Sequence, residues 1–444
     1  MTQFVRGNDG SLEDNNTMTT TKSTVAKKER ALLVTVDVPG KFSWNLEDKE
    51  EELKRLVSSC GMILDECIIC RRKTLTSALF IGKGKVEEIS EIAEETGVDV
   101  VVFSDDLSPS QQKNLEKLIK KKTIDRTQLI LDIFANRAKS NEGKVQVELA
   151  QLGYLLPRLS GKGIQLSRLG GGVGTKGPGE QKLEVDRRRI RERIAKLKRT
   201  LKQITAQRKL RRVQREKFSV LTAALVGYTN SGKSTLFNAL TCSRVKAKDQ
   251  LFSSLDSTVR KLVLPNNKTA VICDTVGFVQ DLPHHLVESF KATLEEVFNA
   301  DILLHVIDIS DHRLQEQKQA VLKVLKELGV QDKPLFTVLN KIDKVPKKAV
   351  QQKIKREFAD SILVSALKVQ GIDELKDKIS IFTQAGMEDI EIMLPRGFYS
   401  LAKAMREKGI IKKEEYTDNG LFISGCVPKE IKCAVFKKLK TRGQ

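Results

Sequence analysis

One eight-residue stretch constrains the fold of this chain more than any other. Residues 227–234 read GYTNSGKS and fit the pattern GxxxxGK[ST], with an apolar run before them and an amphipathic run after them. A strand, a glycine-rich loop and a helix in this order form a phosphate-binding loop, whose backbone amides and helix N-terminus surround an anion. We predict that Lys233 is the catalytic lysine, reaching the β- and γ-phosphates of a nucleotide, and that Ser234 binds Mg²⁺.

Two further motifs follow in the order that a GTPase requires, each after an apolar run predicted to be a strand. They are DTVG at 274–277 and NKID at 340–343. We expect Asp274 to hold Mg²⁺ through water and the Gly277 amide to contact the γ-phosphate. The Asp343 carboxylate can accept two hydrogen bonds that guanine donates and adenine does not, so we predict binding of GTP and GDP rather than ATP.

The remaining nucleotide contacts are predicted from two short loops. Ser365-Ala366-Leu367 is expected to support the guanine with backbone donors. The loop after the first helix must supply a hydroxyl that senses γ-phosphate-bound Mg²⁺; residues 252–256 are the best candidate and an ordinary polar loop is the alternative. The full set of predicted contacts is Gly227, Tyr228, Thr229, Asn230, Ser231, Gly232, Lys233, Ser234, Phe252, Ser253, Ser254, Leu255, Asp256, Asp274, Thr275, Val276, Gly277, Asn340, Lys341, Ile342, Asp343, Ser365, Ala366 and Leu367.

Phe278 directly follows Gly277. Many GTPases have a glutamine there that orients the attacking water, and phenylalanine cannot do so. We therefore predict slow hydrolysis by the protein alone and stimulation by a partner.

Alternation of apolar and polar runs predicts an α/β fold in several parts. Strands alternating with helices indicate a parallel sheet in the first part. Eight glycines between residues 160 and 180 interrupt an otherwise helical region, which predicts two long antiparallel helices joined by a loop. The parts are a disordered tail (1–29), an N-terminal parallel α/β domain (30–125), a helical hairpin (126–218) with its glycine-rich loop (160–180), a GTPase domain (219–386) and a small C-terminal α+β domain (387–444).

Charge points to a polyanionic partner. The chain has a net charge of +21, and residues 181–217 contain sixteen lysines and arginines against four acidic residues, a net charge of +12. Such a one-signed helix favours nucleic acid, although a solvated face is the alternative. The candidate contacts are Arg168, Lys176, Arg187, Arg188, Arg189 and Arg191. Residues 391–444 carry a further excess of basic residues, for which a solvated face is a comparable interpretation.

Other features limit the class of protein. No run approaches the roughly 20 apolar residues of a membrane helix and the first 28 residues lack a signal peptide's apolar core, so we expect a monomeric cytoplasmic protein without stable membrane insertion, and leave peripheral membrane association open. Cys67 and Cys70 form a CxxC within an apolar run; buried thiols are favoured over a zinc site, which needs a second ligand pair.

Together the motifs resemble the HflX family of ribosome-associated GTPases over residues 30–380. The runs that carry the resemblance are GYTNSGKS (227–234), FSSLD (252–256), DTVGF (274–278), NKID (340–343), IGKGK (81–85), DR (125–126), ELAQL (148–152), LPRL (156–159) and GPGE (177–180). The resemblance implies that the partner is the large ribosomal subunit with its rRNA. It also implies that the glycine-rich loop approaches the peptidyl-transferase region and that GTP binding favours splitting of stalled or idle ribosomes under stress.

The resemblance also assigns residues. It makes Ser234 and Ser254 the Mg²⁺ ligands. The family usually has threonine at the position of Ser254; serine keeps the hydroxyl but loses a methyl group, so ordering of the switch loop is expected to be weaker here. The family usually has lysine at the position of Leu367, and leucine there loses the lysine stem but keeps the backbone contact. Some members hydrolyse ATP through the N-terminal domain, but residues 30–125 contain no second phosphate loop, and Gly82–Lys85 is interpreted as a structural turn. The alternative functions are a regulatory switch with a protein or membrane partner and no rRNA contact, and an ATP-driven RNA-remodelling enzyme.

Overall fold

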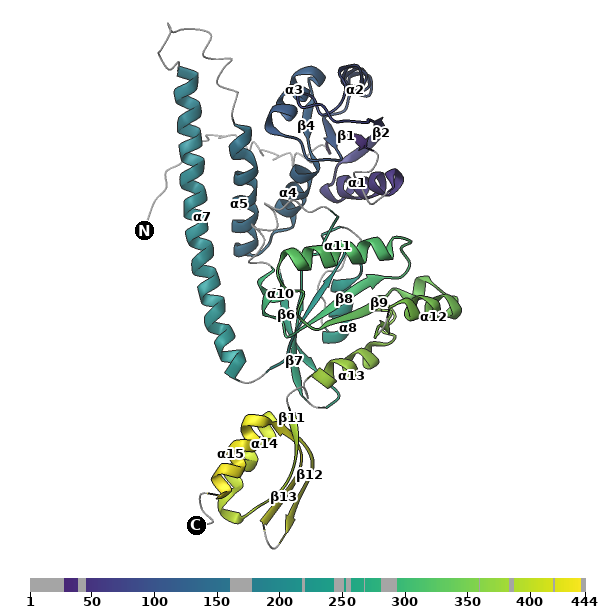
Figure 1. Ribbon diagram of the computed structural model, residues 1–444. Coiled ribbons are helices and arrows are strands. Elements are labelled where there is room, and N and C mark those ends of the chain that lie inside the picture. Colours follow the sequence, from purple (N-terminus) through teal and green to yellow (C-terminus); the bar gives the residue numbers. More distant parts are fainter. Residues whose placement is uncertain are drawn as a thin grey trace, which may run out of the picture.

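The computed structural model describes residues 28–38, 45–159, 178–217, 220–242, 251–252, 257–266, 268–280, 294–358, 360–382, 387–417 and 420–440. Three sheets follow one another along this chain (Figure 1). The predicted α/β fold class is confirmed, with two mainly parallel sheets, a long helical pair and a small antiparallel sheet.

The first sheet is parallel throughout, in the order β2-β1-β3-β4. Its elements are β1 (Arg30–Asp37), α1 (Leu46–Cys60), β2 (Ile63–Arg71), α2 (Lys83–Glu95), β3 (Val100–Phe103), α3 (Pro109–Ile119) and β4 (Lys122–Ile124). Side chains of β1 alternate between two cores, because successive strand residues point to opposite faces. Leu33 packs with α1 on one face, and Leu32 packs with α2 and α3 on the other.

Local signals explain where these helices begin. Asn45 accepts a hydrogen bond from the Asp48 amide at 2.8 Å and caps α1. Ser108 and Gln111 form a capping box at the start of α3, with proline at its first turn. The run Gly82–Lys85 is not a separate turn: Gly82 is the N-cap of α2 and Lys83 begins the helix.

Cys67 and Cys70 lie on β2 three residues apart, so they face opposite sides of the sheet. Cys70 belongs to the core under α2, and Cys67 packs against the core under α1. The two thiols therefore cannot chelate one ion, and the prediction of buried thiols is confirmed for Cys70, which is 2% exposed; Cys67 is half-buried.

The described part of the helical region contains α4 (Arg126–Arg137), α5 (Asn141–Arg158) and α7 (Pro178–Lys217). The expected first arm, 127–159, is interrupted because Ser140 caps a new helix by accepting from the Gly143 amide at 2.9 Å. Helix α7 begins inside the predicted loop, since proline suits the first turn of a helix. Helices α5 and α7 lie side by side and antiparallel, joined by an Arg193–Glu148 ion pair at 2.6 Å (Figure 1).

The second sheet has the order β10-β9-β8-β5-β7-β6, with only the edge strand β6 antiparallel. Its elements are β5 (Thr222–Gly227), α8 (Lys233–Thr241), β6 (Thr258–Val263), β7 (Thr269–Asp274), α10 (Glu295–Asn299), β8 (Ile302–Asp308), α11 (Leu314–Glu327), β9 (Leu335–Asn340), η1 (Ile342–Lys344), α12 (Lys348–Glu357), β10 (Ile362–Leu363) and α13 (Ile372–Phe382). Helices α8 and α13 pack on one face, α10 and α11 on the other. The sequence did not predict β6 or helices α10 to α13.

The third sheet is antiparallel, in the order β11-β13-β12. It contains β11 (Met387–Leu394), η2 (Arg396–Phe398), α14 (Tyr399–Lys408), β12 (Ile410–Thr417), β13 (Gly420–Pro428) and α15 (Lys429–Lys440). The predicted order of strands and helices in this part is confirmed. Within the described ranges, no helix has the length and apolar character needed to cross a bilayer.

The first two sheets share one apolar core. A single cluster of buried residues contains side chains of α1 and α4, next to the first sheet. The same cluster contains side chains of α11 and of the residues that follow β7, next to the second sheet. The rings of Phe134 on α4 and Phe252 meet edge to face, 4.7 Å apart. Phe252 is thereby packed against α4.

Candidate functional site

The loop between β5 and α8 has the curvature of an anion cradle. Its residues Gly227, Asn230 and Gly232 have φ angles of 156°, 62° and 91°. A side chain at Gly227 would place Cβ 2.3 Å from the carbonyl oxygen of Val306, and one at Gly232 would meet Asn340. The two motif glycines are therefore required by backbone conformation and by close approach of neighbouring strands.

Lys233 begins α8 and is 6% exposed. Its ammonium group donates to the carbonyl oxygens of Gly227 at 3.1 Å and Tyr228 at 2.7 Å. Burial lowers the pKa of Lys233 to about 8; Lys341 also lowers it, whereas Asp274 opposes the shift. The buried ammonium group of Lys233 is thus hydrogen-bonded to carbonyl oxygens of its own loop. An anion bound in the loop could replace these contacts and stabilise the buried charge.

The loop also buries hydroxyl groups. Thr229 and Ser231 are 6% and 1% exposed, and neither hydroxyl has a hydrogen-bond partner among the residues described. Ser234, at the N-terminus of α8, is equally buried. Buried donors without partners are costly, and phosphate oxygens would satisfy them. Ser234 and Asp274 supply the oxygen ligands that Mg²⁺ prefers, so the residues present fit this ion.

The DTVG segment lies directly beside the loop. Asp274 ends β7 opposite Leu225 and is fully buried, and the Thr275 hydroxyl donates to the Leu225 carbonyl at 2.5 Å. A Cβ on Gly277 would be 2.9 Å from both the Lys233 ammonium and the Thr229 Cα. The structure therefore brings Gly277 to the end of the loop at which Lys233 points.

Phe278 follows Gly277 and is only 2% exposed. Its ring belongs to the shared core of the two sheets, and its backbone pairs with the loop. The Phe278 side chain is buried away from solvent and has no polar group, so it cannot orient the attacking water.

The NKID and SAL motifs form the other end of the site. Asn340 donates to the Ser231 carbonyl at 2.9 Å, and Lys341 donates to the Asn230 carbonyl at 2.7 Å. Lys341 also pairs with Asp308 at 2.7 Å. The NKID segment thus stabilises the phosphate loop through hydrogen bonds to its backbone.

Asp343 is oriented by the Ser365 hydroxyl, which donates to its carboxylate at 2.5 Å. The amide of Ala366 donates to Asn340 Oδ1 at 3.1 Å, so it does not point outward as a free donor. The role of the Ala366 backbone in supporting the base stays a prediction. Leu367, next along the chain, is 74% exposed at the rim.

The structure joins the four motifs that the sequence predicted to meet, including the remaining predicted contacts Val276 and Ile342. Ser253, Ser254, Leu255 and Asp256 lie outside the described residues, as do the candidates Arg168 and Lys176. Phe252 is described and is buried against the N-terminal sheet.

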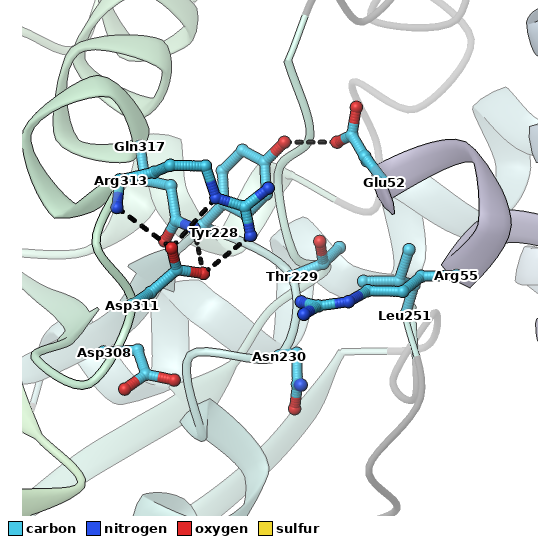
Figure 2. Close-up of a pocket in the computed structure, with 10 residues that line it drawn as sticks. All are labelled: Glu52, Arg55, Tyr228, Thr229, Asn230, Leu251, Asp308, Asp311, Arg313 and Gln317. Carbon is cyan, nitrogen blue, oxygen red and sulfur yellow. Dashed lines mark hydrogen bonds and ion pairs between the residues drawn. The ribbon is translucent and has the colours of Figure 1, made fainter. Parts of the chain in front are cut away.

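One part of the site was missed by sequence reasoning. Helix α1 of the N-terminal sheet reaches the phosphate loop, and its Glu52 and Arg55 line a pocket with Tyr228, Thr229 and Asn230 (Figure 2). The Tyr228 hydroxyl donates to Glu52, a residue 176 positions earlier in the chain. No sequence signal identifies such a contact, because neither residue belongs to a local pattern shared with the other.

Three family models match the chain: GTP-binding GTPase N-terminal at residues 47–135, GTP-binding GTPase Middle Region at 137–215 and 50S ribosome-binding GTPase at 222–341. A solved GTP-binding protein of Sulfolobus solfataricus, in complex with GDP, is 27% identical, covers 80% of this chain and 98% of that chain, and has a TM-score of 0.42.

Relatives named GTPase HflX match most of the sequence. That of Lacrimispora saccharolytica is 42% identical over 91% of this chain and 95% of its own length. That of Caldanaerobacter subterraneus subsp. tengcongensis is 44% identical, over 91% of this chain and 92% of its own length. That of Escherichia coli is 49% identical over 67% of this chain and 70% of its own length. With the phosphate loop and the motifs around it assembled as described, the chain belongs to the HflX family of GTPases, and it binds and hydrolyses GTP.

Proposed function

We propose that this GTPase binds the large ribosomal subunit through its rRNA and promotes the splitting or rescue of stalled or idle ribosomes under stress. The observation that carries the proposal is the exposed basic face of α7. The side chains of Arg188, Arg189 and Arg191 are 70%, 74% and 59% exposed. The description of the family model that matches residues 222–341, 50S ribosome-binding GTPase, supports the same partner.

Local acids do not neutralise this face. Arg188, Arg189 and Arg191 lie 3.9, 4.0 and 3.6 Å from Glu192, Asp186 and Glu184, at the outer limit for an ion pair. Exposed pairs of this kind contribute little to stability. Arg187 is half-buried, 4.0 Å from Glu184. A polyphosphate would replace these weak contacts and release counterions. We propose Arg168 and Lys176, in the glycine-rich segment, as further contacts.

At the nucleotide site we propose the roles that the motifs suggest. Lys233 acts on the β- and γ-phosphates, Gly277 donates its amide to the γ-phosphate, and Asp343 recognises guanine. Mg²⁺ is held by Ser234 and by Ser254 of the switch segment, with Asp274 acting through water. The ion would neutralise phosphate charge, and the chain's own groups hold the phosphates in place.

We further propose the division into a tail, an N-terminal domain, a hairpin, a GTPase domain and a C-terminal domain at the predicted boundaries, and a cytoplasmic monomer. Hydrolysis is slow in the free protein and is stimulated by the ribosome, since Phe278 supplies no group that orients water. The buried position of its ring supports this interpretation.

Sedimentation of ribosomal particles tests the proposal. The wild-type protein with a non-hydrolysable GTP analogue is expected to increase free subunits, and GDP is not. The triple variant Arg188→Gln, Arg189→Gln, Arg191→Gln should bind subunits more weakly, with a salt dependence shallower by about 0.9 per lost phosphate contact.

The matched control is Lys347→Gln, Lys348→Gln, Lys353→Gln on and before α12, which removes the same charge from exposed positions away from the hairpin. Equal weakening by both triple variants would reduce the α7 contact to a general charge effect. Unchanged subunit profiles with every nucleotide would reject the ribosomal function and favour a regulatory switch with another partner.

A further inference from the structure

The hydroxyl group of Tyr228 lies where three segments of the molecule meet. It donates to Glu52 of α1 (Figure 2). It also accepts a hydrogen bond from the Gln280 amide at 2.9 Å. Tyr228 itself is the second residue of the phosphate loop and is 6% exposed. One side chain thus connects the loop, the segment after the DTVG motif and the N-terminal sheet.

We propose that Tyr228 and Glu52 are positioning residues for γ-phosphate recognition, holding the Gly277–Gln280 segment beside Lys233. This inference rests on the roles given to Gly277 and Lys233 under the proposed function. It predicts that the Tyr228 hydroxyl selects the triphosphate over the diphosphate without touching the nucleotide.

The backbone of the segment shows what the hydroxyl holds in place. The Phe278 amide donates to the Gly227 carbonyl at 3.0 Å, and the Thr229 amide donates to the Phe278 carbonyl at 2.7 Å. The bond from Gln280 to Tyr228 is the next contact along the chain. Gly277, immediately before this paired stretch, lies within contact distance of Lys233. The Tyr228 hydroxyl holds this segment at its Gln280 end. The segment in turn keeps the Gly277 amide at the end of the phosphate loop where the γ-phosphate binds.

Glu52 is itself held in one place. Its second carboxylate oxygen accepts from Arg126, the first residue of α4, at 3.0 Å, and the Glu52 and Arg126 side chains are 8% and 12% exposed. A buried carboxylate with a fixed cation keeps one oxygen directed at the tyrosine. The Tyr228 hydroxyl therefore donates to Glu52, which leaves its lone pairs for the Gln280 amide.

The charge state of the tyrosine supports this direction of the hydrogen bonds. Burial, and then the neighbouring Glu52 carboxylate, raise the pKa of Tyr228 well above its ordinary value. The Tyr228 hydroxyl consequently remains protonated at neutral pH, and it continues to donate its hydrogen bond to Glu52.

The test compares affinities of the full-length protein for GDP and for a non-hydrolysable GTP analogue with Mg²⁺. Tyr228→Phe keeps the ring and removes both hydrogen bonds. Its affinity for the analogue should fall about fivefold more than its affinity for GDP, the difference expected for one net hydrogen bond. The single-turnover rate of GTP hydrolysis should fall with it.

A second variant guards against a general folding defect. Glu52→Gln retains the volume and a neutral acceptor, so it should shift the same affinity ratio in the same direction by a smaller factor. The double variant should be no worse than Tyr228→Phe alone, since both changes break one chain of contacts. Tyr154→Phe is the matched control, because it removes a hydroxyl from a tyrosine buried in the same core, on α5, and should leave the ratio unchanged.

The outcomes separate this inference from the roles on which it rests. If Lys233→Ala binds the analogue as tightly as the wild type, the roles of the nucleotide site fail. If Lys233→Ala loses the preference for the triphosphate but Tyr228→Phe retains the wild-type ratio, only the positioning role is wrong. A rise in analogue affinity for Tyr228→Phe would also overturn it, since the hydroxyl would then oppose γ-phosphate binding.

Discussion

Two strand-to-helix connections of this molecule carry glycines and lysines, and only one of them forms a phosphate loop. Between β5 and α8 the chain curls through three positive φ angles, and its helix begins with the buried Lys233. Between β2 and α2 the chain reaches Gly82 in an extended conformation, with φ at −73°. Lys83, which begins that helix, is exposed and pairs with Glu87 at 3.6 Å.

Gly82 in the second connection has a different role. A Cβ there would lie 2.8 Å from the Arg72 guanidinium, so this glycine allows a side chain to approach the backbone closely rather than providing curvature. Glycine content alone therefore does not make an anion site. The curvature that aims successive amides inward does, and it requires specific φ angles at specific residues.

The largest expected effect separates the two lysines. Lys233→Ala should lower kcat/KM for GTP hydrolysis by about 100-fold or more, because it removes a positioned charge from the transferring phosphate. Lys83→Ala should leave hydrolysis unchanged, because that side chain is exposed outside the site. Steady-state phosphate release measures both. A comparable loss in Lys83→Ala would end the distinction between the two connections.

The next effect concerns the backbone. Gly227→Ala should lower the free energy of unfolding by about 2–3 kcal/mol, because its Cβ would collide with a carbonyl oxygen of β8 and its φ of 156° disfavours a side chain. Urea unfolding followed by circular dichroism measures the change. Wild-type stability in this variant would show that the loop can relax and is less constrained than described.

A third effect is a pH dependence of nucleotide affinity. Burial holds the pKa of Lys233 near 8, and bound phosphate charges should raise it. Above pH 8, Lys233 must therefore take up a proton when GDP binds. The affinity for GDP is at its maximum below pH 8 and falls by up to about tenfold per pH unit above it. Calorimetry in buffers with different ionisation enthalpies measures the uptake. Lys233→Arg, which does not titrate in this range, should abolish it.

The smallest effect has the opposite sign. Gly84 lies in the first turn of α2, and its Cβ would meet open space. Gly84→Ala should therefore raise the free energy of unfolding by about 0.5–1 kcal/mol, because alanine loses less backbone entropy on folding. The same urea titration applies, and a loss of stability would show that this glycine is structurally required after all.

Sequence reasoning worked where a signal is local. The phosphate loop, the DTVG strand end and the small C-terminal sheet each follow from short patterns in a single stretch of chain.

What could not be predicted depends on contacts between distant segments. The Tyr228–Glu52 bond joins residues 176 positions apart, and the turn of Ala366 toward Asn340 depends on how β9 and β10 are arranged. The burial of Phe278 depends on a core shared by two sheets. The break between α4 and α5 was missed because helical spacing continues across it and only the Ser140 cap marks it.

The length of α7 allows a small rotation near the nucleotide site to move the far end of the helix a long way. Its 40 residues span about 60 Å at the rise of an α-helix, and only residues 218–221 separate it from β5, the strand that leads into the phosphate loop. Pivoting about that junction by roughly 5° would sweep the far end through about 5 Å. A displacement too small to see at the nucleotide can therefore become, at the opposite end of the molecule, a movement as large as a side chain.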